Sequence, residues 1–227
     1  MSRAAIVRAV ARKDVSIEWN SRVLINQVAP FAAIVMVMFA FALDNDGILQ
    51  RVAPGLVWLA ALFSMLVVVQ RSFAVETADG ALDALRVAGV DPAAIFLGKS
   101  LALMLQLLVL EVVLVATSIV LYGVSIGPPG LLLLAVVSVL ATTGLGFVGT
   151  LYGGLAGGAR GRETLLPLLM LPVVAPVLIG ATRATEAAYG SAGAAIGEGW
   201  PWCGLLAVFA VLFGVVGSLS FGPLIDE

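Results

Sequence analysis

Six long apolar stretches, separated by short polar segments, restrict what this chain can fold into. They cover residues 24–43, 53–69, 93–122, 131–155, 165–181 and 202–221. At about 1.5 Å of rise per residue, helices of roughly this length suit a hydrocarbon core of about 30 Å. Only 11% of the residues are charged and 61% are hydrophobic, whereas soluble domains are about 25% charged. We therefore expect an all-α polytopic membrane protein with one six-span domain, 24–221.

The positive charges are distributed unevenly between the two sides of such a bundle. If the N-terminal segment lies in the cytoplasm, only Arg51 and Arg183 of the 12 lysines and arginines lie on the outer side. Cytoplasmic loops carry such an excess of Lys and Arg. Since an even number of spans returns the chain to its starting side, we expect both termini, including the 222–227 tail, to be cytoplasmic. The predicted location is the cytoplasmic (inner) membrane, with multiple passes.

Residues 1–23 precede the first span and are basic, with apolar residues scattered among the charges. Their helical phase is loose. We interpret this segment as a cytoplasmic interfacial helix. The alternative is a basic flank that only sets the topology.

A charged island, residues 70–91, separates the second and third spans. A charged side chain at the bilayer centre costs about 2.5–3.5 kcal/mol on insertion scales, so this island must lie outside the hydrocarbon. Read as a helix over 76–87, it is amphipathic, because Leu82 and Leu85 share one face while charged residues occupy another arc. We interpret it as a cytoplasmic coupling helix that contacts another protein; the alternative is that it rests in the headgroup layer. The residues expected to carry this contact are Glu76, Asp79, Gly80, Leu82, Leu85 and Arg86.

One acidic residue, Glu111, lies deep within an apolar stretch. An intramembrane carboxylate must be protonated, paired or directed into a polar cavity, and it is a functional candidate by default. The expected partner is Gln106, Thr117 or Ser118 on the same helix, or a group on another span. Two roles stay open, an interhelical hydrogen bond that fixes packing and a direct role in transport or gating.

The fourth and fifth spans carry patterns of small and helix-bending residues. Glycines recur every four residues, which lets two helix backbones approach closely in lipid. We expect this stripe to contact another span of the chain, with a dimer seam as the alternative. Three prolines in the fifth span each remove a backbone donor and predict a bent or broken helix, such as those that border translocation paths. The residues concerned are Gly149, Gly153, Gly157 and Gly161, and Pro167, Pro172 and Pro176.

Residues that the chain lacks exclude several kinds of chemistry. Histidine is absent, so Ser-His and Cys-His catalysis and histidine ligation of zinc or haem are excluded. The single cysteine, Cys203, excludes an internal disulfide and a multi-cysteine metal site. Gly98-Lys99-Ser100 is not a P-loop, because Ala93 stands where the first glycine belongs; we expect Lys99 to snorkel to the inner headgroups. We therefore expect a non-enzymatic chain without catalytic, cofactor-binding or metal-binding residues.

Three stretches together resemble the CcmB family, the membrane subunit of the cytochrome c maturation (haem exporter) ABC system. They are RKDVSIEWNSR at 12–22, the segment from APGLVWLAALF to IFLGKS at 53–100, and LPLLMLPVVAPVLIGA at 166–181. The middle stretch is the most specific, because an apolar span, R-x-F, E-x-x-x-G and G-K follow one another in the family's order. The length and the six-span pattern agree as well.

The resemblance implies an ABC-2-type permease-like fold that works as a homodimer with a cytoplasmic ATP-binding subunit. It also implies a complex with haem-handling membrane proteins, with ATP and any haem held by partner subunits, and no contact with nucleic acid. The implied function couples ATP hydrolysis to haem export or to release of a haem chaperone. Two alternatives stay open. One is an ABC-2 permease for a lipid, glycan or drug, and the other is an ion-gradient-driven secondary transporter using Glu111.

Overall fold

The computed structural model describes residues 2–43, 45–80, 84–85, 87–156 and 162–226, and within these ranges all regular structure is helical. Six helices are long and apolar enough to cross a membrane, as judged by length and composition. This confirms the predicted all-α architecture with six candidate spans. The elements in chain order are α1 (Arg3–Ser21), a short π-helix η1 (Leu24–Val28), α2 (Ala29–Ala42), α3 (Asp46–Asp79), α5 (Pro92–Tyr122), α6 (Pro128–Ala156), α7 (Arg162–Tyr189), the 3-10 turn η2 (Ser191–Gly193) and α8 (Ile196–Asp226).

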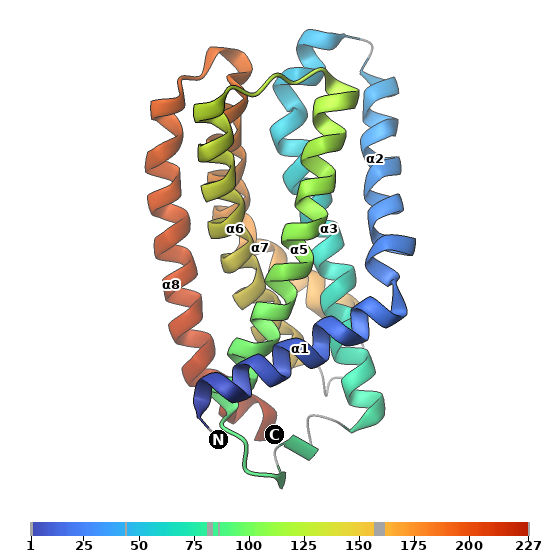
Figure 1. The fold of residues 1–227 in the computed structure, drawn as a ribbon, viewed down its shortest axis with the longest axis vertical. Helices are drawn as coiled ribbons and strands as arrows, with labels where there is room; N and C mark the ends of the chain where they lie inside the picture. Colours follow the sequence, from blue (N-terminus) through green and yellow to red (C-terminus); the bar gives the residue numbers. More distant parts are fainter. Residues whose placement is uncertain (1, 44, 81–83, 86, 157–161, 227) are drawn as a thin grey trace.

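The six long helices stand side by side in one bundle (Figure 1). Helix α6 contacts α3, α5, α7 and α8, whereas the main contacts of α2 with the other long helices are those with α3 and α5. The interior is filled by large apolar side chains that are less than 2% exposed, including Trp58, Met65, Leu110, Leu133 and Leu145. A second, smaller apolar cluster lies near the end of the bundle that carries both termini. There Ile95, Phe96, Leu151 and Phe221 pack together.

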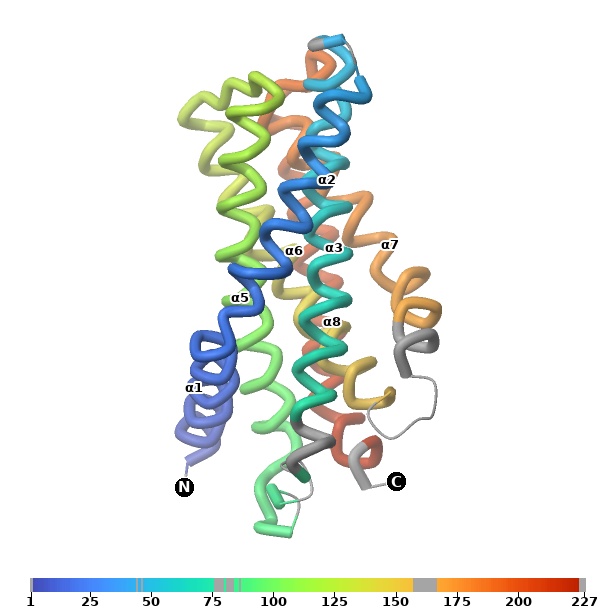
Figure 2. The backbone as a smooth tube through the Cα atoms, turned by 90° about the vertical axis from the view of Figure 1, so that its right-hand side faces the viewer, coloured from blue at the N-terminus to red at the C-terminus, as the bar shows by residue number. Residues whose placement is uncertain are grey.

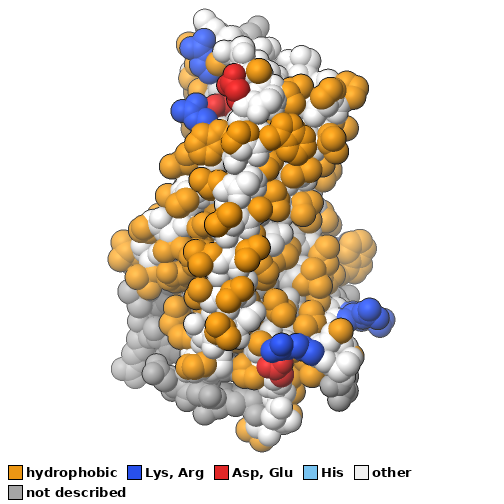
Figure 3. Space-filling model, turned by 90° about the vertical axis from the view of Figure 1, so that its left-hand side faces the viewer, with side chains coloured by type: hydrophobic (Ala, Val, Ile, Leu, Met, Phe, Trp, Pro, Cys, Tyr) orange, Lys and Arg blue, Asp and Glu red, His pale blue; other side chains and the backbone are white. Residues whose placement is uncertain are grey.

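The surface of the bundle is suited to lipid. On the face that Figure 3 draws, a broad hydrophobic band separates charged side chains gathered toward the two ends of the molecule. Both chain termini lie at the same end (Figure 1). That arrangement is the one expected for a protein with an even number of spans.

Helix α1 crosses the bundle obliquely instead of running along it (Figures 1 and 2). Its N-terminus is capped by Ser2, whose hydroxyl accepts a hydrogen bond from the N–H of Ala5. It ends at Arg22, which has a left-handed conformation with φ 52°. The Glu18 carboxylate then accepts a hydrogen bond from the N–H of Leu24, which opens η1. This joint turns the chain from α1 into the first candidate span.

The second long helix extends further than its apolar core. Helix α3 runs from Asp46 to Asp79, so Glu76 and Asp79 continue this span and do not begin a separate helix. The predicted start of the coupling helix at Glu76 is therefore corrected. The physical reason is that no helix breaker follows the apolar stretch until Gly80, where φ is +61°. Polar residues after the apolar stretch mark where α3 leaves the lipid, but they do not interrupt the helix.

Candidate functional site

Glu111 lies inside the bundle on α5 and is 2% exposed. Its Oε1 accepts a hydrogen bond of 2.9 Å from the hydroxyl of Ser138 on α6. Its Oε2 has no hydrogen-bond partner among the described residues. The partner therefore lies on another span, which was one of the alternatives left open by the sequence. Two of the same-helix candidates bond elsewhere, since Thr117 donates to the carbonyl of Val113 and Ser118 donates to that of Val115.

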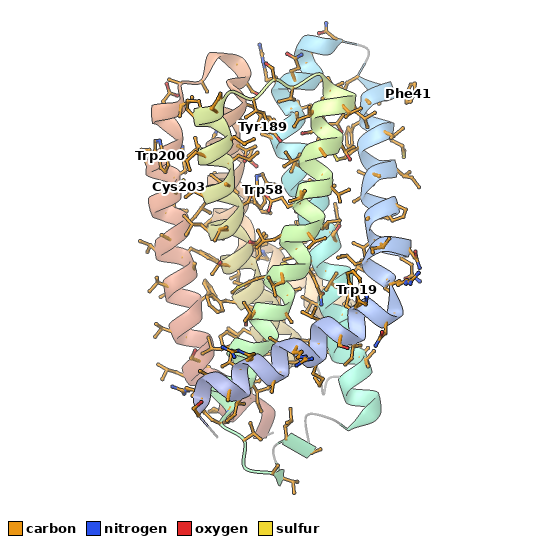
Figure 4. All side chains as sticks on the ribbon, in the orientation of Figure 1. Trp19, Phe41, Trp58, Tyr189, Trp200 and Cys203 are labelled. Atoms are coloured by element: carbon orange, nitrogen blue, oxygen red, sulfur yellow. The ribbon has the colours of Figure 1, made fainter. Side chains whose placement is uncertain are left out.

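Two further side-chain hydrogen bonds join helices in the half of the bundle away from the termini. The hydroxyls of Ser118 and Tyr189 lie 3.0 Å apart and link α5 to α7. The indole N–H of Trp58 donates to the hydroxyl of Thr185 at 2.9 Å and links α3 to α7. Figure 4 shows Trp58 and Tyr189 within the bundle. Because these bonds are made in an apolar interior, they fix how the helices are rotated against one another.

Lys99 forms a buried ion pair with Asp14, 3.1 Å from Nζ to Oδ2, between α5 and α1. The two residues are 3% and 8% exposed. The expectation that Lys99 snorkels to the headgroups is therefore wrong: α1 lies over the start of α5 and covers this lysine. The ammonium group also lies 4.7 Å from the ring centroid of Phe73 on α3. Lys13 provides a second cation 2.9 Å from Asp14.

The ion pair borders small pockets lined by α1, α3 and α5, and in one of them also by α6. Polar side chains from all four helices converge there, which is unusual for the interior of a membrane bundle. Sequence reasoning missed this junction, because the loose helical phase of residues 1–23 hid the fact that Asp14 shares a buried face with Val10 and Ala11. The polar residues lining the pockets are Asp14, Glu18, Arg71, Ser72, Lys99, Gln106 and Thr150.

The glycine stripe of α6 faces other spans of the same chain where the structure describes it. A Cβ at Gly149 would lie 2.8 Å from Leu103 Cδ2 on α5, and one at Gly153 would lie 2.5 Å from Phe73 Cδ2 on α3. These contacts favour the intramolecular packing role over a dimer seam. Gly157 and Gly161 lie outside the described residues.

Helix α7 is continuous through Pro167, Pro172 and Pro176. Figure 2 shows its first half diverging from the other helices, while its second half rejoins the bundle. The helix is therefore not broken in the described range.

The structure describes only some of the predicted coupling residues, and those described lie at the end of the molecule that carries the termini (Figure 1). Leu82 and Arg86, and the side chains of Glu76 and Asp79, lie outside what it describes. Leu85 packs partly against the smaller apolar cluster. Val87, which sequence reasoning did not select, is 88% exposed. The N–H of Ala84 donates to the carbonyl of Gly80.

No group of three or more acidic, histidine or cysteine residues that could hold a metal ion occurs in the part of the chain that the structure describes. The arrangement is that of a polytopic helical membrane protein whose polar groups tie helices together. The sequence matches the profile of the family described as CcmB protein over residues 5–222. The chain belongs to the CcmB family.

Several curated relatives carry the name Heme exporter protein B. The protein of Rhodobacter capsulatus is 35% identical over 153 residues, which cover 66% of this chain and 68% of the relative. That of Paracoccus denitrificans is 34% identical over 167 residues, covering 72% and 74%. That of Haemophilus influenzae is 29% identical over 194 residues, covering 85% and 82%.

Proposed function

We propose that this chain is the membrane subunit of an ABC transporter complex for cytochrome c maturation. A separate cytoplasmic ATPase hydrolyses ATP, and this chain couples that hydrolysis to haem export or to release of a haem chaperone. The observation that carries the proposal is the family match over residues 5–222, together with relatives named Heme exporter protein B. In this proposal the chain spans the inner membrane with both termini in the cytoplasm and works as a homodimer beside haem-handling membrane proteins.

The ATPase would contact the segment between α3 and α5. Both helices are long, 34 and 31 residues, so a push on the short connection acts directly on two spans. Leu85 packs partly inward, whereas Val87 is almost fully exposed. Exposed apolar side chains on a short helical segment suit a groove on a partner protein. We therefore add Val87 to Leu82 as a contact of the ATPase.

Haem enters this proposal as cargo. The chain has no histidine, and histidine is a common axial ligand of haem iron. The iron would accordingly be held by a partner while this subunit supplies the conformational change. That division of labour supports release of a haem chaperone from a neighbouring subunit as strongly as passage of haem through the bundle.

The test of the proposed complex is affinity purification of the full chain from native membranes in mild detergent, with mass spectrometry of the proteins retained. An ATP-binding subunit together with haem-handling membrane proteins is the expected result. Recovery of the ATPase alone would keep the ABC assignment and return the cargo to a lipid, glycan or drug. Absence of any ATPase from cross-linked preparations would overturn the proposal.

The coupling segment is tested in the same purification with Val87→Asp. The substitution adds a charge to an exposed side chain, so the chain should still insert and fold while the ATPase is lost. Ser16→Asp is the matched control, because it adds the same charge to an exposed position of α1. Equal recovery of the ATPase with both variants would exclude Val87 from the contact.

The unpartnered carboxylate oxygen of Glu111 supports a second candidate function, transport driven by an ion gradient. A buried acid with spare hydrogen-bonding capacity can carry a proton or a cation across a membrane. This candidate predicts activity without an ATPase. It is separated from the first by the Glu111 variant described in the Discussion.

A further inference from the structure

Two arginines form an exposed basic pair on α1. Arg8 and Arg12 are one helical turn apart, so their side chains lie side by side on the helix surface. Both are exposed. Two guanidinium groups at this spacing present the planar donors that match a phosphate group.

The acids of this region are engaged elsewhere and do not neutralise the pair. Asp91 accepts from Arg3 at 2.7 Å, and Asp14 is paired with Lys99 inside the bundle. The Glu18 carboxylate accepts the N–H of Leu24. No described residue forms an ion pair with Arg8 or Arg12. The pair therefore keeps its charge available to a ligand.

An apolar groove runs beside this basic pair, between α1 and α5. Its walls combine the apolar residues of α1 with a stripe on α5, and the arginines stand at its rim. On the α5 side, Leu101 is 39% and Leu105 is 45% exposed. The apolar residues lining the groove are Ala4, Val7, Ala11, Val15, Leu97, Leu101 and Leu105.

The groove continues along α1 toward the first span. A second hollow shares Val15 and Leu105 with the first and adds Trp19, Ile25 and Val109. Trp19 is 75% exposed and lies at the end of α1 that leads into α2 (Figure 4). An exposed tryptophan beside apolar surface is typical of the level where headgroups meet acyl chains.

We propose that this groove is a binding site for one anionic phospholipid. Its phosphate lies between Arg8 and Arg12, and an acyl chain lies against Leu101 and Leu105. Charge complementarity selects this occupant. Arg8 and Arg12 provide positive charge for a negative headgroup, and the apolar wall beside them accommodates an acyl chain. A second copy of the chain fits less well, since a two-fold contact through α1 would bring like charges together.

The test measures lipid retained by the full chain in native mass spectrometry. The protein, purified in mild detergent, is titrated with phosphatidylglycerol or phosphatidylcholine carrying identical acyl chains. We expect wild type to retain phosphatidylglycerol preferentially, and R8Q/R12Q to reduce that preference by roughly thirtyfold. The control is R51Q/R183Q, which removes the same charge from the opposite end and should leave the preference unchanged. Equal retention of both lipids by wild type, or equal losses in the two variants, would overturn the proposal.

Two further arms identify the ligand. L101N/L105N should lower the retention of both lipids together, because the acyl chain loses its apolar wall while the arginines remain. Inorganic phosphate should not displace bound phosphatidylglycerol; displacement would reduce the site to a simple anion site and contradict the lipid assignment. Conversion of a dimer peak to monomer in R8Q/R12Q, without loss of lipid, would assign the groove to a second copy instead.

Discussion

The buried acids Asp14 and Glu111 are accommodated in different ways. Asp14 has two lysines within 3.1 Å, whereas Glu111 has one neutral hydroxyl on Oε1. An ion in a low-dielectric interior needs a counter-charge, because desolvation costs several kcal/mol per ion. The first site therefore holds charges, and the second relies on hydrogen bonding.

Breaking the buried ion pair should destabilise the fold. We expect Lys99→Met to lower the free energy of unfolding by about 3 kcal/mol, because Asp14 loses a buried counter-charge. The double variant K99M/D14L should recover most of this loss, since apolar side chains can replace a buried pair at little cost. Unfolding of the full chain in mixed micelles measures both.

The control is Arg183→Gln, which breaks the exposed pair of Arg183 and Glu186 and should cost less than about 1 kcal/mol. A loss in K99M no larger than in this control would show that the buried pair does not hold α1 to α5.

Glu111→Gln separates packing from ion transport. Glutamine keeps the size of the side chain and an oxygen for Ser138, so we expect near-normal stability and normal c-type cytochrome levels in a complemented deletion strain. Glu111→Ala should lower the free energy of unfolding by about 2 kcal/mol, through a cavity and an orphaned hydroxyl. A folded but inactive Glu111→Gln protein would instead favour the gradient-driven transporter.

Residue-scale features were predicted only in part. Glu111 stands out in the sequence because every neighbour is apolar. Its bond to Ser138 spans 27 positions and that of Lys99 to Asp14 spans 85. No local spacing reports such a pairing, since the helices that carry the partners meet only in the folded bundle.

At the scale of the element, α6 packs closely against its neighbours through small residues. Glycine lets the backbone of α6 approach Phe73 and Val69 of α3 at Gly153. In a membrane such contacts contribute much of the attraction between helices, because lipid supplies no hydrophobic driving force for association.

Gly153→Ala should therefore destabilise the protein by about 1–3 kcal/mol, the usual cost of overpacking. The matched control is Gly204→Ala on α8, where a Cβ would meet nothing within 4 Å. There the change should be neutral or stabilising by about 0.5–1 kcal/mol, because alanine loses less backbone entropy in a helix. Unfolding midpoints of both variants in the same detergent decide the matter; similar shifts would contradict the packing role.

The existence of the spans could be read from the sequence, and so could the ends of the first and third, but the ends of the second could not. Hydropathy reports where side chains tolerate lipid, and it located all six. Helix α3 extends beyond its predicted span, 53–69, at both ends. Polar residues such as Gln50 and Arg71 are unfavourable in lipid but do not interrupt a helix. Gly80 ends α3 through its backbone conformation, which hydropathy does not measure.

At the scale of the whole molecule, the two ends differ in charge and in what they carry. The termini and α1 lie at one end (Figure 1), and Arg51 and Arg183 belong to the other. The uneven distribution of Lys and Arg predicts that the end with the termini is cytoplasmic.

Single introduced cysteines test this orientation. In a Cys203→Ser background, we expect Ala195→Cys to react with a membrane-impermeant maleimide on intact spheroplasts. Ser2→Cys should react only after lysis. Labelling of Ser2→Cys in intact spheroplasts would reverse the assignment. Both positions are exposed, so access to the reagent depends on the side of the membrane.

The arrangement of the six spans in the bundle could not be predicted from sequence patterns. Six helices of similar hydropathy can be ordered in many ways, and the order is decided by which small and polar side chains meet. The family resemblance did predict a permease-like bundle, and the family match over residues 5–222 confirms the membership on which it rested.

Chain order and mechanical grouping differ in this protein. Helix α1 precedes α2 in the chain, yet α1 packs against α5. The buried ion pair of Lys99 and Asp14 joins α1 to α5. Its link to α2 is a single left-handed residue, Arg22, followed by a π-helical turn. The N-terminal helix α1 thus belongs mechanically to the third span. If α5 tilts, α1 moves with it along the membrane surface, while the bend between α1 and α2 allows the first span to keep its position.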